Sequence, residues 1–79
     1  MDQIYIILYD QQGHIISTFT SNIRNTSMLK YHITARMKAT KAATCMFCDG
    51  VLIHYKVRGV WHKCSQARFS VSLLLQESE

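Results

Sequence analysis

This chain of 79 residues is 48% hydrophobic, contains eight aromatic residues and lacks proline. It is too short for a catalytic domain beside a regulatory one and too apolar for a disordered tail, so we expect residues 1–79 to form one small domain. The net charge is +4, but the stretch from Arg24 to Arg68 holds all nine Lys and Arg with Asp49 as its one acid, which is +8 for that stretch. This basic middle favours nucleic acid or an acidic protein surface as a partner, unless the charge serves only solubility.

The N-terminal residues have an acid, Asp2, where a secretory signal would carry positive charge. No apolar run approaches the ~18 residues that cross a bilayer, so we expect no membrane segment. Three cysteines are an odd number and suit free thiols or metal ligands in a reducing compartment. The sequence therefore predicts an intracellular, cytoplasmic protein.

The first twenty residues predict a β-hairpin. Residues 3–9 place Ile4, Ile6 and Leu8 on one side and further apolar side chains on the other, as in a strand covered on both faces. Asp10-Gln11-Gln12-Gly13 has turn chemistry, and residues 14–20 follow as the returning strand.

A helix is predicted next, from about Met28 to Thr44. The preceding Ser, Thr and Asn residues offer three candidate N-caps, Asn25, Thr26 and Ser27. A helical wheel aligns one polar stripe, Lys30, Thr34, Lys38 and Lys41. The opposite, alanine-rich side is expected to pack on the sheet, with Leu29, Ile33 and Met37 on its flank.

The C-terminal part predicts three strands. Residues 51–57 and 60–66 flank Arg58-Gly59, which indicates a second hairpin, and residues 69–76 alternate apolar and polar side chains. The order is ββαβββ, and the predicted fold class is α+β, with one helix packed on a mostly antiparallel sheet.

The second hairpin carries the leading functional hypothesis. A two-residue loop at Arg58-Gly59 would set Lys56 opposite Trp61 and His54 opposite Lys63. The face with Ile53 and Tyr55 would then be the core side. The other face would point outward and carry His54, Lys56, Trp61 and Lys63, with Arg58 at the tip.

Such an outward face has the parts of a nucleic-acid platform, because cations neutralise phosphates and an indole ring stacks on bases. The stripe of Lys30, Lys38 and Lys41 would extend this footprint, unless it is only a solvated helix face. Two alternatives for Trp61 stay open. The helix or a neighbouring strand covers it, or Lys56 merely lies over its ring. The same patch would also suit a protein-interaction hot spot.

The cysteines offer a metal hypothesis that we rank below free thiols. Cys45 and Cys48 have the C-x-x-C spacing of a zinc knuckle, and His62 and Cys64 would supply two further ligands. The two pairs are expected to lie far apart along the sheet, so the sequence predicts no metal and no cofactor.

No phosphate-binding glycine loop and no paired carboxylates occur, so we expect no enzyme. The leading prediction is a small binding module that contacts nucleic acid through the basic and aromatic hairpin face. One alternative is an accessory or inhibitor protein, of the kind that phages and mobile elements encode, that binds and blocks a host protein. Another is a structural homodimer formed through an unpaired edge strand.

Overall fold

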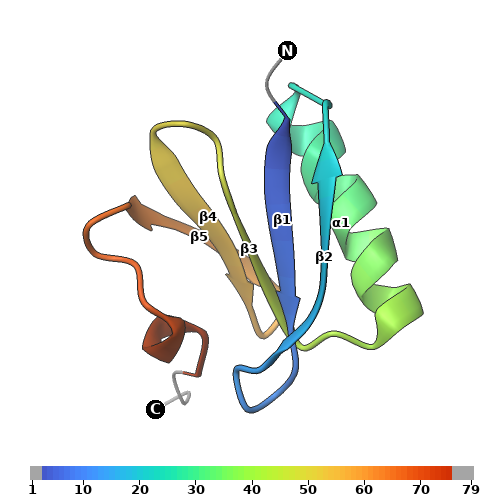
Figure 1. Ribbon diagram of the computed structural model, residues 1–79, viewed down its shortest axis with the longest axis vertical. Coiled ribbons are helices and arrows are strands. Elements are labelled where there is room, and N and C mark those ends of the chain that lie inside the picture. Colours follow the sequence, from blue (N-terminus) through green and yellow to red (C-terminus); the bar gives the residue numbers. More distant parts are fainter. Residues whose placement is uncertain (1–2, 76–79) are drawn as a thin grey trace.

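The computed structural model describes residues 3–75, which form a five-stranded antiparallel sheet with one helix packed against it (Figure 1). The strands are β1 (Ile4–Tyr9), β2 (Ile15–Ser21), β3 (Thr44–Cys48), β4 (Leu52–Val57) and β5 (Val60–Ser65), in the spatial order β2-β1-β3-β4-β5. Helix α1 (Thr26–Thr40) joins β2 to β3, and a 3₁₀ helix, η1 (Val71–Leu75), follows β5. The predicted α+β class and the ββαβββ order are confirmed. Within residues 3–75 no helix has the length and apolar composition needed to cross a membrane.

The predicted first hairpin is confirmed, and Asp10 organises its turn. Oδ1 of Asp10 accepts hydrogen bonds from the backbone N–H groups of Gln12 and His14, both at 2.9 Å. Gly13 then takes a φ of +84°, in the left-handed region that favours glycine. These local bonds close the turn before β2 begins at Ile15.

Helix α1 starts at the first of the three predicted caps, since Oδ1 of Asn25 accepts from the N–H of Met28 at 3.0 Å. Its buried residues are Leu29, Ile33 and Met37, and its alanine-rich side faces water. The predicted alanine-packed face is therefore wrong. Large aliphatic side chains spaced four residues apart bury more apolar area than alanines, so they decide which side of the helix packs on the sheet.

The helix also ends earlier than the sequence predicts, at Thr40 instead of Thr44. Lys41 caps it in the left-handed conformation, with φ 60° and ψ 34°, and donates its N–H to the carbonyl of Met37. The chain then enters β3, which we did not predict. Phe47 of β3 pairs with β1 on one side and with β4 on the other, so this unpredicted strand is the centre of the sheet.

The predicted strand at residues 69–76 is wrong as well. Residues 71–75 form η1, and Gln76 lies outside the described residues. The hydroxyls of Ser70 and Ser72 lie 2.7 Å apart, and Leu74 is buried against the sheet. The segment therefore packs on a face of the sheet and does not add a strand to it.

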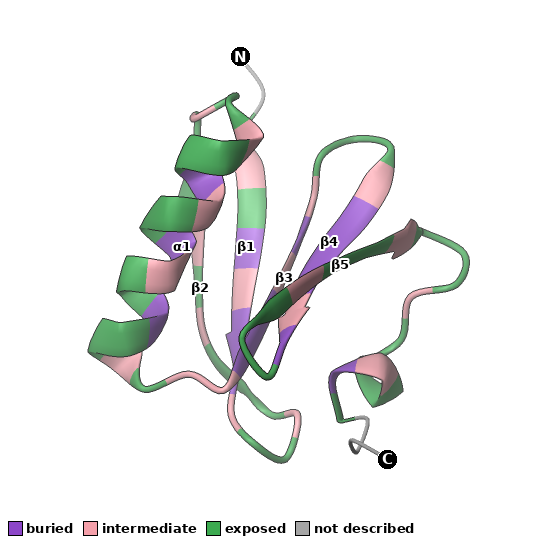
Figure 2. Ribbon diagram, turned by 180° about the vertical axis from the view of Figure 1, so that it is seen from behind, coloured by how far each residue is buried: buried purple, intermediate pink, exposed green. Residues whose placement is uncertain are grey.

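Two apolar clusters lie on opposite faces of the sheet. Figure 2 marks the buried positions along the ribbon. The α1-side cluster contains Ile6, Leu8, Leu29, Ile33, Met37, Cys45 and Phe47. The η1-side cluster contains Tyr9, Ile53, Tyr55, Val57 and Leu74. The sheet is thus packed on both faces, and the apolar residues of β4 belong to the η1-side cluster.

The register of the second hairpin is as predicted. Lys56 pairs with Trp61 and His54 pairs with Lys63. Arg58 and Gly59 have φ values of 50° and 80°, the two left-handed residues of a type I′ turn. This turn matches the twist of the strands and fixes which side chains of the hairpin share a face.

Candidate functional site

The hairpin face that we predicted to point outward lies against α1. Nζ of Lys56 donates to Oγ1 of Thr34 in the middle of the helix, at 3.0 Å. Trp61 is half-buried and packs against the α1-side cluster. The expectation that Trp61 projects into water is therefore wrong, and the alternative of cover by the helix holds. The helix packs here because the side chains of Ile6 and Phe47 make this face of the sheet apolar, and the helix buries them.

His54 is likewise no exposed contact residue, because it is only 5% exposed. Its ring stacks on Phe47 with 4.7 Å between centroids, and its Nε2 lies 2.7 Å from Oδ2 of Asp49. Its buried Nδ1 has no hydrogen-bond partner among the described residues. Because the carboxylate of Asp49 can only accept, Nε2 of His54 is the donor of this hydrogen bond.

Asp49 ties this histidine to the turn between β3 and β4. Its Oδ1 accepts from the backbone N–H groups of Val51 and Leu52, at 2.9 and 2.8 Å. The hydrogen bond from His54, followed by those two backbone bonds, holds the pKa of Asp49 well below its usual value. Asp49 and His54 therefore hold the turn between β3 and β4 in place, and all the donors to the carboxylate come from residues 51–54.

Two ammonium groups from different elements converge on the indole of Trp61. Nζ of Lys30, from α1, lies 5.1 Å from the ring centroid, and Nζ of Lys56, from β4, lies 5.6 Å from it. Phe47 meets the same indole edge to face, with 5.8 Å between centroids. The alternative in which Lys56 lies over the ring therefore holds as well as cover by the helix. Two cations occupy ring surface on which a base would otherwise stack.

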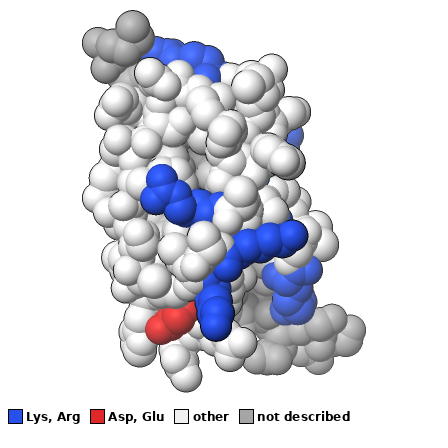
Figure 3. Space-filling model, turned by 90° about the vertical axis from the view of Figure 1, so that its right-hand side faces the viewer, with Lys and Arg blue, Asp and Glu red and all other residues white. Residues whose placement is uncertain are grey.

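The remaining cations of the predicted site surround this cluster. Lys38 and Lys41 are exposed on α1 and at its end, Lys63 is exposed on β5, and Arg58 stands at the hairpin tip. Figure 3, which views the molecule from the α1 side, shows several Lys and Arg side chains and few acidic atoms. Lys38, Lys41 and Lys56 line one hollow, and Lys30 and Lys56 lie over one indole, so these four lysines of α1 and β4 share a surface. We define the basic face as these four with the two further cations of the β4–β5 hairpin, Arg58 and Lys63.

The acids of residues 3–75 do not neutralise these lysines. Both ion pairs found there join an aspartate to a histidine, His14 to Asp10 and His54 to Asp49, and no lysine takes part in one. The other three acids of the chain, Asp2, Glu77 and Glu79, lie outside the described residues.

A hollow of about 320 Å³ opens within the basic face, between α1 and the β4–β5 turn. Three lysines line it, Lys38 and Lys41 from the helix and Lys56 from β4. Thr34, Met37, Ala42 and Gly59 complete its wall. The fold therefore gathers three like charges from two elements around one concavity.

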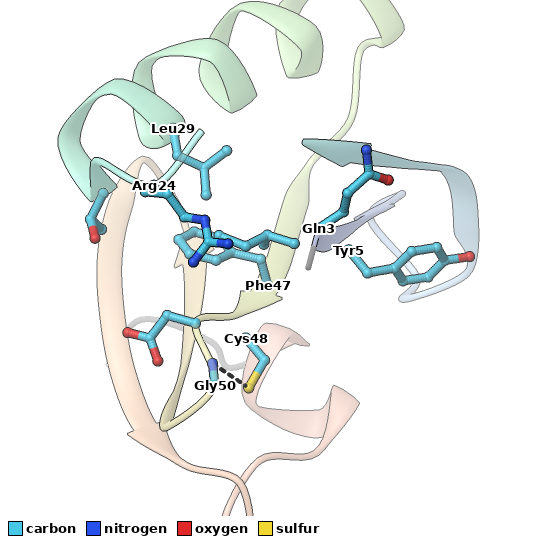
Figure 4. Close-up of a pocket in the computed structure, with 10 residues that line it drawn as sticks. Gln3, Tyr5, Arg24, Leu29, Phe47, Cys48 and Gly50 are labelled. Atoms are coloured by element: carbon cyan, nitrogen blue, oxygen red, sulfur yellow. Dashed lines mark hydrogen bonds between the residues drawn. The ribbon is translucent and has the colours of Figure 1, made fainter. Parts of the chain in front are cut away.

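A second hollow, of about 510 Å³, lies at the opposite end of α1 (Figure 4). Phe47 lines it together with one base, Arg24, and one acid, Asp49. Sγ of Cys48 accepts from the backbone N–H of Gly50 at 3.4 Å, the bond drawn in Figure 4. Its two charges are of opposite sign, so this hollow gives a polyanion no net attraction.

The structure does not bring the four candidate zinc ligands together. Cys45 and Cys48 lie three residues apart within β3 and so face opposite sides of the sheet. Burial in the α1-side cluster raises the pKa of Cys45 to about 12. Cys48 and Cys64 share the other face but flank Ile53 on β4, two strand spacings or ~10 Å apart. Among the residues that the structure describes, no three potential metal ligands cluster, and His62 stacks on Tyr55.

Comparisons with protein-family models, with curated proteins and with solved structures found no match to this chain.

Proposed function

We propose that this protein is a small, non-enzymatic binding module that contacts nucleic acid through its basic face. The observation that carries the proposal is the convergence of lysines from α1 and from the β4–β5 hairpin on one surface, while no lysine has an ion-pair partner among residues 3–75. Lysines that no acid of residues 3–75 pairs with attract a polyanion to this surface.

Binding would draw on counterion release. Each phosphate that a lysine or arginine neutralises frees condensed cations from the nucleic acid, so affinity falls steeply as salt rises. Six contacts would weaken binding roughly 10³-fold between 50 and 200 mM salt. Because Trp61 already shares its ring with two ammonium groups, we expect contacts to the phosphate backbone and little preference for base sequence.

Part of the face is already ordered before any ligand arrives. Lys30 and Lys56 are half-buried, both lie over Trp61, and Lys56 is also hydrogen-bonded to Thr34. A long side chain that is ordered in the free protein loses less conformational entropy on binding. We therefore expect Lys56 to contribute more to affinity than the exposed Lys63.

Binding suits this surface better than catalysis does. The most buried thiol, Cys45, has a raised pKa and so little nucleophilic thiolate at neutral pH. The buried imidazole of His54 donates to Asp49 and lies under Phe47, away from any substrate. Neither group is placed to act on a molecule held by the basic face.

A salt titration tests the proposal directly. Fluorescence anisotropy of labelled single-stranded and double-stranded oligonucleotides would be measured from 50 to 200 mM salt. Lys56→Gln should make the slope of log K against log salt shallower by roughly one unit for duplex DNA. Arg36→Gln is the matched control, because this arginine lies over Phe19 of β2, on another side of α1, at 4.3 Å.

The absence of oligonucleotide binding at 50 mM salt would contradict the proposal. An acidic protein partner, as expected of an accessory or inhibitor protein, would then be sought by pull-down with the same lysine variants. Light scattering on the free protein would test the homodimer alternative. That alternative depends on a free sheet edge, and the β2 edge has no charged residue between Ile15 and Ser21.

A further inference from the structure

We infer that the hollow between the C-terminal half of α1 and the β4–β5 turn is a phosphate-binding site, with Lys38, Lys41 and Lys56 as its ligating residues. This inference deepens the proposed function, because it rests on the same basic face and names the group that would be held there. It also extends to phosphate carried by a small molecule.

The shape of the hollow suits an anion held by several cations at once. Its volume of about 320 Å³ exceeds that of a single phosphate and leaves space for the sugar or other group that carries it. Gly59 of the β4–β5 turn lines the hollow and has no side chain to occupy it, and a Cβ built there would meet no atom within 4 Å.

Lys56 is positioned in advance. Its Nζ donates to Oγ1 of Thr34 at 3.0 Å, and that hydroxyl donates in turn to the carbonyl of Lys30 at 2.9 Å. An ammonium group has three N–H donors, so the bond to Thr34 leaves others for a ligand. This chain of bonds fixes the cation at the wall of the hollow.

Lys41 supplies an independent observation. It takes the left-handed conformation at the helix cap, where glycine is the preferred residue, and its side chain lines the hollow. A non-glycine residue in this conformation is strained, and such strain often accompanies function. Stability alone would favour glycine here, so we assign the lysine to the binding of the anion.

Phosphate fits the hollow better than a carboxylate does. Three of the residues that line the hollow are lysines, and their combined charge suits a phosphate of charge between −1 and −2 better than a monovalent carboxylate. The remaining wall contributes the hydroxyl of Thr34, and no acid lines it to repel the anion.

The test is a titration of the ¹⁵N-labelled protein with inorganic phosphate, with sodium chloride at equal ionic strength as the reference. Saturable shifts should appear at the amides of Lys41, Ala42 and Gly59. Lys41→Gly should weaken phosphate binding about two- to five-fold, while its melting temperature stays equal or rises. Lys56→Gln should weaken it about ten-fold, and Arg36→Gln, a matched loss of charge elsewhere on α1, should change it little.

Shifts that spread over the whole basic face, or that chloride reproduces, would overturn the inference. Equal losses in Lys41→Gly and Arg36→Gln would overturn it too. Oligonucleotides with and without a 5′-phosphate separate the two sources, because a terminal phosphate that binds more tightly marks an end or small-molecule site, whereas equal binding marks the backbone. If phosphate binds but oligonucleotides do not, the proposed function is contradicted and the phosphate site stands. If oligonucleotides bind but cause no shifts at the hollow, the phosphate site is contradicted and the proposed function stands.

Discussion

The β1–β2 hairpin and the β4–β5 hairpin lie at the two ends of the same sheet, but their charges differ. Residues 4–21 contain no Lys or Arg, whereas residues 52–65 contain Lys56, Arg58 and Lys63 and no acid. The two turns differ as well. Asp10 braces the first turn with its carboxylate, and the second consists of two left-handed residues, Arg58 and Gly59.

This difference bears on why the protein is basic. Lysines kept only for solubility would serve as well at Thr18 and Thr20, which are exposed on β2. The chain instead places its hairpin cations at the end of the sheet where α1 adds more of them. The uneven distribution of charge supports a role in binding.

The largest expected effect is the loss of stability when the packing under the second hairpin is removed. Phe47 is fully buried and contacts both His54 and Trp61. Phe47→Ala should lower the free energy of unfolding by about 3–5 kcal/mol in urea denaturation, because it leaves a cavity at the centre of the sheet. Tyr5→Ala in β1 is the comparison, and this side chain is 56% exposed, so its loss should cost about 0.5 kcal/mol. Equal costs would mean that the centre of the sheet does not lie at β3.

The next largest effect is expected when positive charge is moved from the basic face to the first hairpin. The triple variant Lys38→Gln, Lys56→Gln and Lys63→Gln should make the salt slope of duplex binding shallower by roughly 2.7 units. Adding Ile16→Lys, Thr18→Lys and Thr20→Lys restores the net charge on exposed positions of β2. We expect this second variant to regain little affinity in the anisotropy titration. Full recovery would show that only net charge matters.

The two turn glycines should differ by a smaller amount. Gly59→Ala strains a residue at φ +80° but meets no neighbour, so it should cost about 1–2 kcal/mol. Gly13→Ala has the same backbone penalty, and its Cβ would also lie 3.0 Å from Cγ1 of Val71 in η1. We therefore expect Gly13→Ala to cost about 1 kcal/mol more in thermal denaturation. The reverse order would mean that η1 does not pack on the first turn.

Local rules were enough to predict both hairpins. A two-residue loop has one compatible register, so Arg58-Gly59 alone set Lys56 opposite Trp61. Side-chain chemistry likewise limited the helix cap to Asn25, Thr26 and Ser27, and the structure has Asn25 in that place. In each case the residues that decide the geometry lie within a few positions of one another in the chain.

Long-range packing decided what the sequence did not reveal. Thr44 to Cys48 has no clean alternation of apolar and polar residues, because β3 is buried on both faces, and its C-x-x-C spacing suggested a turn. The hairpin pattern showed that His54 and Trp61 share a face, but it contained no signal that α1 lies over that face. Thr34, the partner of Lys56, was missed for the same reason, since only the packed structure brings the two residues together.

The smallest expected effect is a difference between Asp10 and Asp49, the carboxylates of the first turn and of the β3–β4 turn, in how they make stability depend on pH. Hydrogen bonds lower the pKa of both Asp10 and Asp49 below the ordinary value of 3.8. A carboxylate whose pKa is lowered by folding stabilises the folded state. This stabilisation is fully present above the ordinary pKa of 3.8 and is lost as the pH falls through the lowered pKa of the folded state. Asp49→Asn and Asp10→Asn should both flatten the acid limb of the curve of unfolding free energy against pH.

We expect the greater flattening for Asp49→Asn. Asp49 accepts a 2.7 Å bond from the buried ring of His54 as well as two backbone bonds, whereas His14 stands 3.6 Å from Asp10 and its side chain is 79% exposed. Water screens the pair in the first turn and leaves little of its Coulomb energy. Urea denaturation at pH values on both sides of 3.8 measures the two slopes. A steeper residual slope in Asp49→Asn than in Asp10→Asn would contradict this assignment and shift the acid-sensitive contact to the first hairpin.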